Sequence, residues 1–117
     1  MVAYPTNTAQ ISLQQLRREL RLSRERMARL MDVSAKTIER WEARADIPPA
    51  ASARARLMNI REILDLGRIV YTPDGFQIFL TTPQPRFQGA TALQLMEIGR
   101  TADILAALAE DYEGLGT

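Results

Sequence analysis

Three serines in the first half of the chain each precede a short run of apolar residues at helical spacing. Ser12 is followed by leucines at positions 13, 16 and 20, and Ser23 by apolar residues at 27, 28, 30 and 31. Ser34 is followed by Ile38 and Trp41, one helical turn apart. A serine side chain can accept a hydrogen bond from a free amide of the first helical turn, and residues three or four positions apart share a helix face. The pattern predicts three short helices joined by tight turns.

A longer helix is predicted after the Ile-Pro-Pro break at residues 47–49, since Pro49 is favoured at a first helical position. Gly67 is expected to weaken or end this helix. Its apolar stripe fits either the core of this chain or a seam between two copies of it. The stripe consists of Leu57, Ile60, Ile63 and Leu64.

Residues 69–80 fit two structures. Apolar runs at 69–71 and 76–80 flank a Thr-Pro-Asp-Gly turn sequence, which is typical of a β-hairpin. Alternatively, Thr72 caps a short helix with Pro73 at its first position, and periodicity does not separate the two. Further on, residues 81–89 predict a loop, Thr91 is expected to cap a short helix that Gly99 ends, and Thr101 opens a last helix.

Composition removes several classes of function. The 117 residues are 46% hydrophobic, which is enough for a core. The absence of cysteine fits a reducing cytoplasm, and the absence of histidine removes the commonest general base and metal ligand. No apolar run is long enough to predict a membrane span. We therefore expect a cytoplasmic protein that is not an enzyme and needs no cofactor or metal.

Charge is divided unevenly along the chain. Residues 12–68 contain 13 basic and 8 acidic residues, a net charge of +5, whereas the remainder contains 2 basic and 6 acidic residues, a net charge of −4. A basic first part and an acidic second part favour different partners for the two.

Residues 22–42 have the layout of two helices that cross closely. Ala28 is small where the helices would meet, and Asp32 lies at the turn, where aspartate tolerates a left-handed backbone. We expect Val33, Ile38 and Trp41 to fill the angle between the helices, so that the following helix projects outward.

This segment resembles the Xre/Cro-like repressor helix-turn-helix. The Ser-x-x-Thr-Ile-x-x-Trp-Glu pattern of residues 34–42 is close to the recognition helix of that family, although Asp32 stands where the family usually has glycine. The resemblance implies that Ala35, Lys36 and Arg40 face base edges, with Glu39 at the margin. It also implies phosphate contacts, which we expect from Arg24, Thr37, Arg44 and Arg17, with Arg18 and Arg21 as further candidates.

The second half is similar to the C-terminal toxin-binding domain of MbcA/ParS/Xre-type antitoxins. The similarity is carried by Phe-Leu-Thr-Thr-Pro-Gln-Pro-Arg-Phe-Gln-Gly-Ala-Thr-Ala-Leu-Gln-Leu at residues 79–95, which departs from the family at Phe79, Gln84, Phe87, Gln88 and Ala92. It implies an all-helical domain, a homodimer and, in many members, a RES-type toxin as partner. The residues implied in toxin binding are Pro83, Pro85, Phe87, Gly89 and Thr91. Loop and cap chemistry alone would also account for these residues.

Together these observations predict an all-α protein: an N-terminal helix-turn-helix DNA-binding bundle followed by a small helical C-terminal antitoxin-type domain. The expected parts are a flexible arm (1–11), the helix-turn-helix (12–48), a connecting helix (49–68) and a toxin-binding or dimerisation domain (69–117). The implied function is that of a repressor that binds a double-stranded operator as a homodimer, regulates its own operon and neutralises a RES-type toxin. The alternatives are an interaction module with vestigial DNA binding and a regulator with no toxin.

Overall fold

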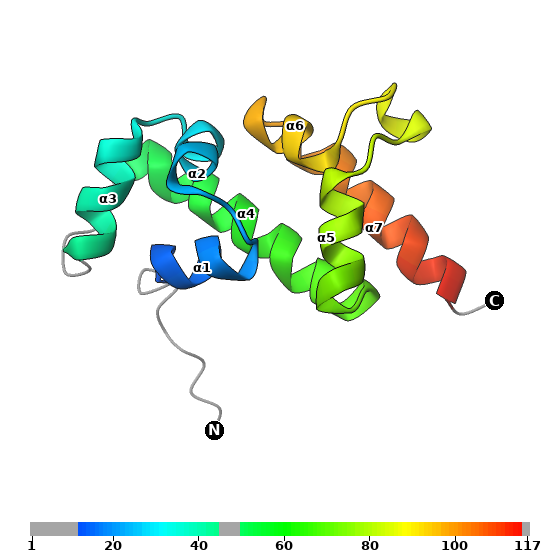
Figure 1. Cartoon of the computed structure of the whole chain (residues 1–117). Coiled ribbons are helices and arrows are strands. Elements are labelled where there is room, and N and C mark those ends of the chain that lie inside the picture. Colours follow the sequence, from blue (N-terminus) through cyan, green and yellow to red (C-terminus); the bar gives the residue numbers. More distant parts are fainter. Residues whose placement is uncertain (1–11, 45–49, 116–117) are drawn as a thin grey trace. The chain divides into compact units, whose positions relative to one another are not determined.

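The computed structural model describes residues 12–44 and 50–115, and within them all regular secondary structure is helical (Figure 1). The all-α prediction is therefore confirmed for this part of the chain. The expected arm at residues 1–11 and the expected helix start at Pro49 lie outside the described residues. By its internal contacts the chain divides into two compact units, Met1–Met58 and Asn59–Thr117. The division falls inside the long helix α4 (Ala51–Val70), so this helix contributes to both units.

The first unit contains α1 (Leu13–Glu19), α2 (Arg24–Met31) and α3 (Ala35–Ala43), followed by the first residues of α4. Each of the three predicted serine caps is present. Ser12, Ser23 and Ser34 accept hydrogen bonds through Oγ from the amides of Gln15, Arg26 and Thr37 at 3.1, 3.0 and 3.1 Å. These bonds satisfy donors that have no partner in the helix itself, and they place the starts of the helices where the sequence predicts them.

The turn between α2 and α3 occupies residues 32–34. Asp32 has the predicted left-handed backbone, with φ 58° and ψ 47°. Helix α3 packs against both α2 and α1, and Ile38 on its inner face is fully buried. Val33 and Trp41 are only partly buried, so the prediction that all three residues fill the angle is correct for Ile38 and overstated for the other two. The interior consists mainly of Leu16, Leu20, Met27, Leu30 and Met31.

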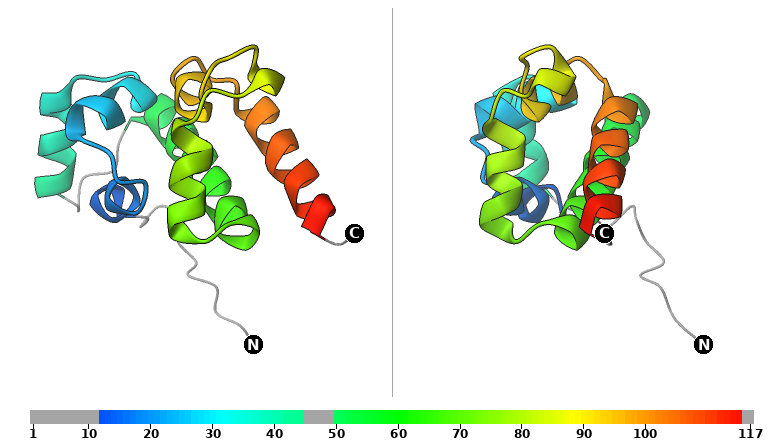
Figure 2. Two further views of the ribbon diagram at one scale, coloured as in Figure 1. Left: turned by 45° about the vertical axis from the view of Figure 1, so that its right-hand side comes forward. Right: turned by 90° about the vertical axis from the view of Figure 1, so that its right-hand side faces the viewer.

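The second unit contains the rest of α4, then α5 (Pro73–Thr81), the short 3-10 helix η2 (Pro85–Phe87), α6 (Ala92–Glu97) and α7 (Thr101–Leu115). Helix α6 packs against α5 and against α7 (Figure 2). Residues 73–81 form the helix and not the hairpin: Thr72 Oγ1 accepts a hydrogen bond from the Gly75 amide at 3.0 Å, and Pro73 occupies the first turn. The helix is favoured because it buries Phe76, Phe79 and Leu80 on one face.

Two further predictions about helix ends have different outcomes. Thr91 caps α6 in a reciprocal arrangement with Gln94: each side chain bonds the backbone amide of the other residue, at 3.1 and 2.9 Å. Gly67 does not end α4, which continues to Val70. None of the described helices is both long enough and apolar enough to span a membrane.

Candidate functional site

The outer face of α3 presents charged side chains to solvent. Lys36, Glu39 and Arg40 are all exposed, while Ile38 is buried on the opposite side of the same helix. Positions 36, 39 and 40 are three and four residues apart, so their side chains lie on one face of the helix. Ala35, in the first turn, is partly buried. The face has a net positive charge, and two long donor side chains can reach outward from it.

Two of the expected phosphate contacts lie at the ends of α3. Thr37 is partly buried, and its hydroxyl lies 2.8 Å from the Ser34 hydroxyl, so it is already part of the helix cap. Arg44 is exposed at the other end, where its amide donates to the Arg40 carbonyl at 3.0 Å. Thr37 thus has a structural role beside any contact with a ligand, whereas Arg44 extends the basic face.

The carboxylate of Glu42 holds α3 to the rest of the first unit. Arg17 Nε donates to Glu42 Oε2 at 2.6 Å and Arg17 Nη2 donates to Oε1 at 3.0 Å, a two-pronged ion pair. Arg17 Nη1 also donates to the Leu22 carbonyl at 3.0 Å. The side chain of Arg17 is 15% exposed and that of Glu42 only 2%. These donors are used inside the unit, and the phosphate contact expected of Arg17 stays a prediction.

Arg24 has a different environment, although it shares the same carboxylate. Its Nε donates to Glu42 Oε1 at 3.1 Å, yet its side chain remains 44% exposed. It is the first residue of α2. Among the expected phosphate contacts, Arg24 is thus one that the first unit both holds in place and leaves accessible.

The electrostatics of this cluster favour charged forms throughout. Burial alone would raise the pKa of Glu42, but hydrogen bonds from Arg17 and Arg24 outweigh this and hold its pKa below the usual value. The hydrogen bond to Glu42 raises the pKa of Arg17. Glu42 is therefore a carboxylate at neutral pH, and its negative charge is shared between two arginines.

A second candidate site lies around the loop that follows α5. The loop is closed by backbone bonds from the Gln84 amide to the Ala90 carbonyl at 3.1 Å and from the Gly89 amide to the Gln84 carbonyl at 2.9 Å. Pro83, Pro85 and Gly89 are exposed on it. Of the other two residues implied in toxin binding, Phe87 is 5% exposed and Thr91 is the cap of α6. The five residues thus separate into an exposed set and a structural pair.

Arg86 fastens this loop to α7. Its Nη1 and Nη2 donate to the two carboxylate oxygens of Asp111, both at 2.8 Å, and its Nε donates to Gln84 Oε1 at 2.7 Å. The guanidinium carbon lies 5.7 and 5.6 Å from the ring centroids of Phe79 and Phe87, within cation–π range. The Tyr71 hydroxyl donates to the same carboxylate of Asp111. Hydrogen bonds from Arg86 hold the pKa of Asp111 below its usual value, and burial raises the pKa of Tyr71.

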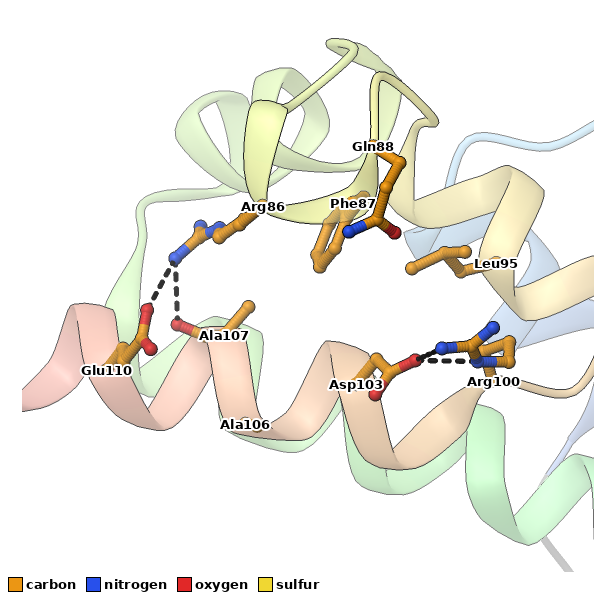
Figure 3. Close-up of a pocket in the computed structure, with 9 residues that line it drawn as sticks. All are labelled: Arg86, Phe87, Gln88, Leu95, Arg100, Asp103, Ala106, Ala107 and Glu110. Carbon is orange, nitrogen blue, oxygen red and sulfur yellow. Dashed lines mark hydrogen bonds and ion pairs between the residues drawn. The ribbon is translucent and has the colours of Figure 1, made fainter.

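A shallow pocket opens beside this cluster (Figure 3). Arg86, Phe87 and Gln88 reach toward it from the loop, Leu95 from α6, and Asp103, Ala106, Ala107 and Glu110 from α7. Arg100 and Asp103 form an ion pair at one end, and Arg86 and Glu110 form another, with N–O distances of 2.5 and 3.4 Å. The lining is mixed: Phe87, Leu95, Ala106 and Ala107 are apolar, whereas Arg86, Gln88, Arg100, Asp103 and Glu110 are polar or charged. Within residues 12–44 and 50–115 there is no cluster of acidic side chains suited to a metal ion.

The fold is similar to one found in a toxin–antitoxin complex. The similarity is to the antitoxin in the crystal structure of the M. tuberculosis MbcT-MbcA complex, with a TM-score of 0.72 over 88% of this chain and 92% of that chain. The two sequences are 20% identical over the match, so the likeness establishes a shared fold. Searches with protein-family models and against curated proteins find no match.

Sequence reasoning missed the ion pairs that organise both sites. Glu42 was visible as the last residue of the Ser34 pattern, but its partner Arg17 is 25 residues away in the sequence. Arg86 was one of only two basic residues outside residues 12–68, and its isolation in an acidic segment was the available signal. In both cases the sequence shows a charged residue but does not show which residue of opposite charge it pairs with.

Proposed function

We propose that this protein is a sequence-specific DNA-binding repressor that serves as the antitoxin of a toxin–antitoxin system. The observation that carries the proposal is the outer face of α3, where Lys36 and Arg40 are exposed above the buried Ile38. An α-helix fits the major groove of duplex DNA, and long cationic donors at this spacing suit guanine O6 and N7. Ala35 could contact a thymine methyl, Glu39 lies at the edge of the face, and Arg24, Thr37 and Arg44 flank it toward the phosphates.

The second unit supports the partner side of the proposal. The exposed residues Pro83, Pro85 and Gly89 lie on the loop that the Arg86–Asp111 pair joins to α7, next to the pocket. The similar fold occurs in a toxin–antitoxin complex. We infer that this loop and pocket contact a toxin of the RES class, and that the chain acts as a cytoplasmic homodimer, since modules of this kind bind paired half-sites. The proposal assigns it no enzymatic activity and no cofactor.

DNA binding is tested with a duplex taken from immediately upstream of the protein's own gene and an unrelated duplex of equal length. We expect Arg40→Ala to weaken binding to the first duplex by about 1–3 kcal/mol while leaving binding to the second nearly unchanged. Arg100→Ala, which removes the same charge from the exposed end of the pocket in the second unit, provides the matched control. Equal losses on both duplexes for Arg40→Ala would remove this residue from base readout.

The partner is tested by co-expression with the adjacent reading frame and purification through a tag on the adjacent product. Stable co-purification supports the antitoxin assignment if Phe87→Ala or Arg86→Ala abolishes it. Toxin binding without DNA binding would favour an interaction module with vestigial DNA binding. DNA binding without any partner would favour a stand-alone regulator.

A further inference from the structure

The geometry points to Glu42 as a positioning residue that aims Arg24 at a DNA phosphate. This inference rests on the DNA-binding function proposed above and adds to it a residue that need not itself contact the DNA. Its basis is the arrangement of three side chains, one each from α1, α2 and α3: Arg17, Arg24 and Glu42.

Glu42 is held mainly by Arg17. Both of its oxygens accept hydrogen bonds from Arg17, and its side chain is 2% exposed. The carboxylate is thus more constrained than the Arg24 side chain, which is 44% exposed. Two arginines and one carboxylate together keep one net positive charge, and Arg24 is the most exposed of the three side chains.

The bond from Arg24 uses only one of its donors. A guanidinium carries five N–H donors in a rigid plane, and here Nε–H is directed to Glu42 Oε1 at 3.1 Å. The hydrogen bond to Glu42 therefore does not use the two Nη atoms of Arg24. A guanidinium held through Nε keeps its outer edge free for a two-pronged contact with phosphate oxygens. Because its plane is already fixed, less side-chain freedom is lost on binding.

Phosphate contacts do not depend on base sequence, so the test uses a random-sequence duplex of 25 base pairs and measures its affinity between 50 and 200 mM salt. Wild type is compared with Arg24→Ala, Glu42→Gln and the double variant, each at a temperature where circular dichroism shows it folded. Each phosphate contact contributes about 0.9 to the slope of log affinity against log salt. Over this fourfold range of salt, the affinity of wild type should thus fall about threefold more than that of Arg24→Ala.

If Glu42 positions Arg24, Glu42→Gln should lose most of this threefold extra fall in affinity, as Arg24→Ala does. Adding Arg24→Ala to Glu42→Gln should then change the salt dependence little. Glu113→Gln is the matched control, because it removes the same charge from an exposed position in the second unit; Arg24→Ala should keep its full effect in that background. If Arg24→Ala has its full effect in the Glu42→Gln background, or if Glu42→Gln tightens binding by freeing Arg24, Glu42 does not position Arg24.

Arg24→Lys gives a second route that leaves the Arg17–Glu42 pair intact, so it applies even if Glu42→Gln does not fold. Lysine keeps the charge but cannot bond Glu42 and present a planar fork to phosphate at the same time. We expect Arg24→Lys to lose at least half of the salt-dependent contribution of Arg24, and full retention would overturn the positioning role. If wild type binds the duplex normally and only these comparisons fail, the proposed function stands without the positioning role. If wild type does not bind any duplex at 50 mM salt, both fall.

Discussion

Three residues other than glycine have a left-handed backbone in the described part of the chain: Arg21, Asp32 and Gln88, with φ of 58°, 58° and 54°. The sequence predicted only Asp32, because aspartate after an apolar helical run is a recognisable helix end. Arg21 and Gln88 carry no such signal, since neither side chain favours this conformation. Local geometry can therefore be predicted where side-chain chemistry matches it, and not where packing around the turn imposes it.

We expect Asp32→Gly to raise the free energy of unfolding by about 1 kcal/mol. Glycine removes the strain of a Cβ in the left-handed region, and the change also removes a carboxylate from the negative end of the α2 dipole. The greater freedom of glycine in the unfolded chain offsets part of this gain. Urea unfolding followed by the fluorescence of Trp41, the single tryptophan, provides the measurement.

Asp32→Asn separates the two contributions, because it removes the charge and keeps a side chain that tolerates the left-handed backbone. It should recover about half of the gain. A loss of stability in Asp32→Gly would show that the Asp32 side chain makes a stabilising interaction that outweighs its strain.

At the scale of elements, the helices of the first unit follow from the sequence more directly than the junction of α4 and α5. The serine caps and apolar spacing define α1, α2 and α3 locally. The junction depends on a contact between elements: a Cβ placed on Gly67 would overlap three carbon atoms of the Phe76 ring. That contact exists only if residues 73–81 form a helix, which the pattern left open. Gly67 was therefore read as a weak point, although it is the position where the Phe76 ring packs against α4.

We expect Gly67→Ala to lower the free energy of unfolding by about 1–3 kcal/mol through overpacking. This loss includes an opposing gain in helix propensity, because alanine is favoured over glycine in a helix interior by about 1 kcal/mol. Gly114→Ala in α7 is the control, since a Cβ there meets nothing within 4 Å, and it should be neutral or slightly stabilising. Circular dichroism in urea measures both. Equal stabilisation of the two variants would show that Phe76 moves aside without cost.

At the scale of the whole molecule, each unit contains a carboxylate that an arginine from another part of the same unit holds in its charged form. These carboxylates are Glu42 in the first unit and Asp111 in the second. In both units the arginine and the carboxylate are 25 residues apart in the sequence. The uneven charge along the chain indicated that the halves differ, but composition does not reveal a pair this distant. The ion pairs of both units are therefore identified only in the folded structure.

These ion pairs predict a loss of stability in acid. The folded-state pKa values of Glu42 and Asp111 lie below their unfolded values, so their contribution is fully present above the ordinary carboxylate range and is lost as pH falls through the folded values. We therefore expect each carboxylate to contribute to the decrease in unfolding free energy between pH 7 and pH 3. Glu42→Gln and Asp111→Asn should each be less stable at pH 7 and lose less on acidification, whereas Glu113→Gln, exposed in the same helix as Asp111, should follow wild type. Urea unfolding at each pH, followed by Trp41 fluorescence for the first unit and circular dichroism for the whole chain, assigns each loss to its unit. A variant that loses as much stability as wild type would show that its carboxylate is not preferentially stabilised in the folded state.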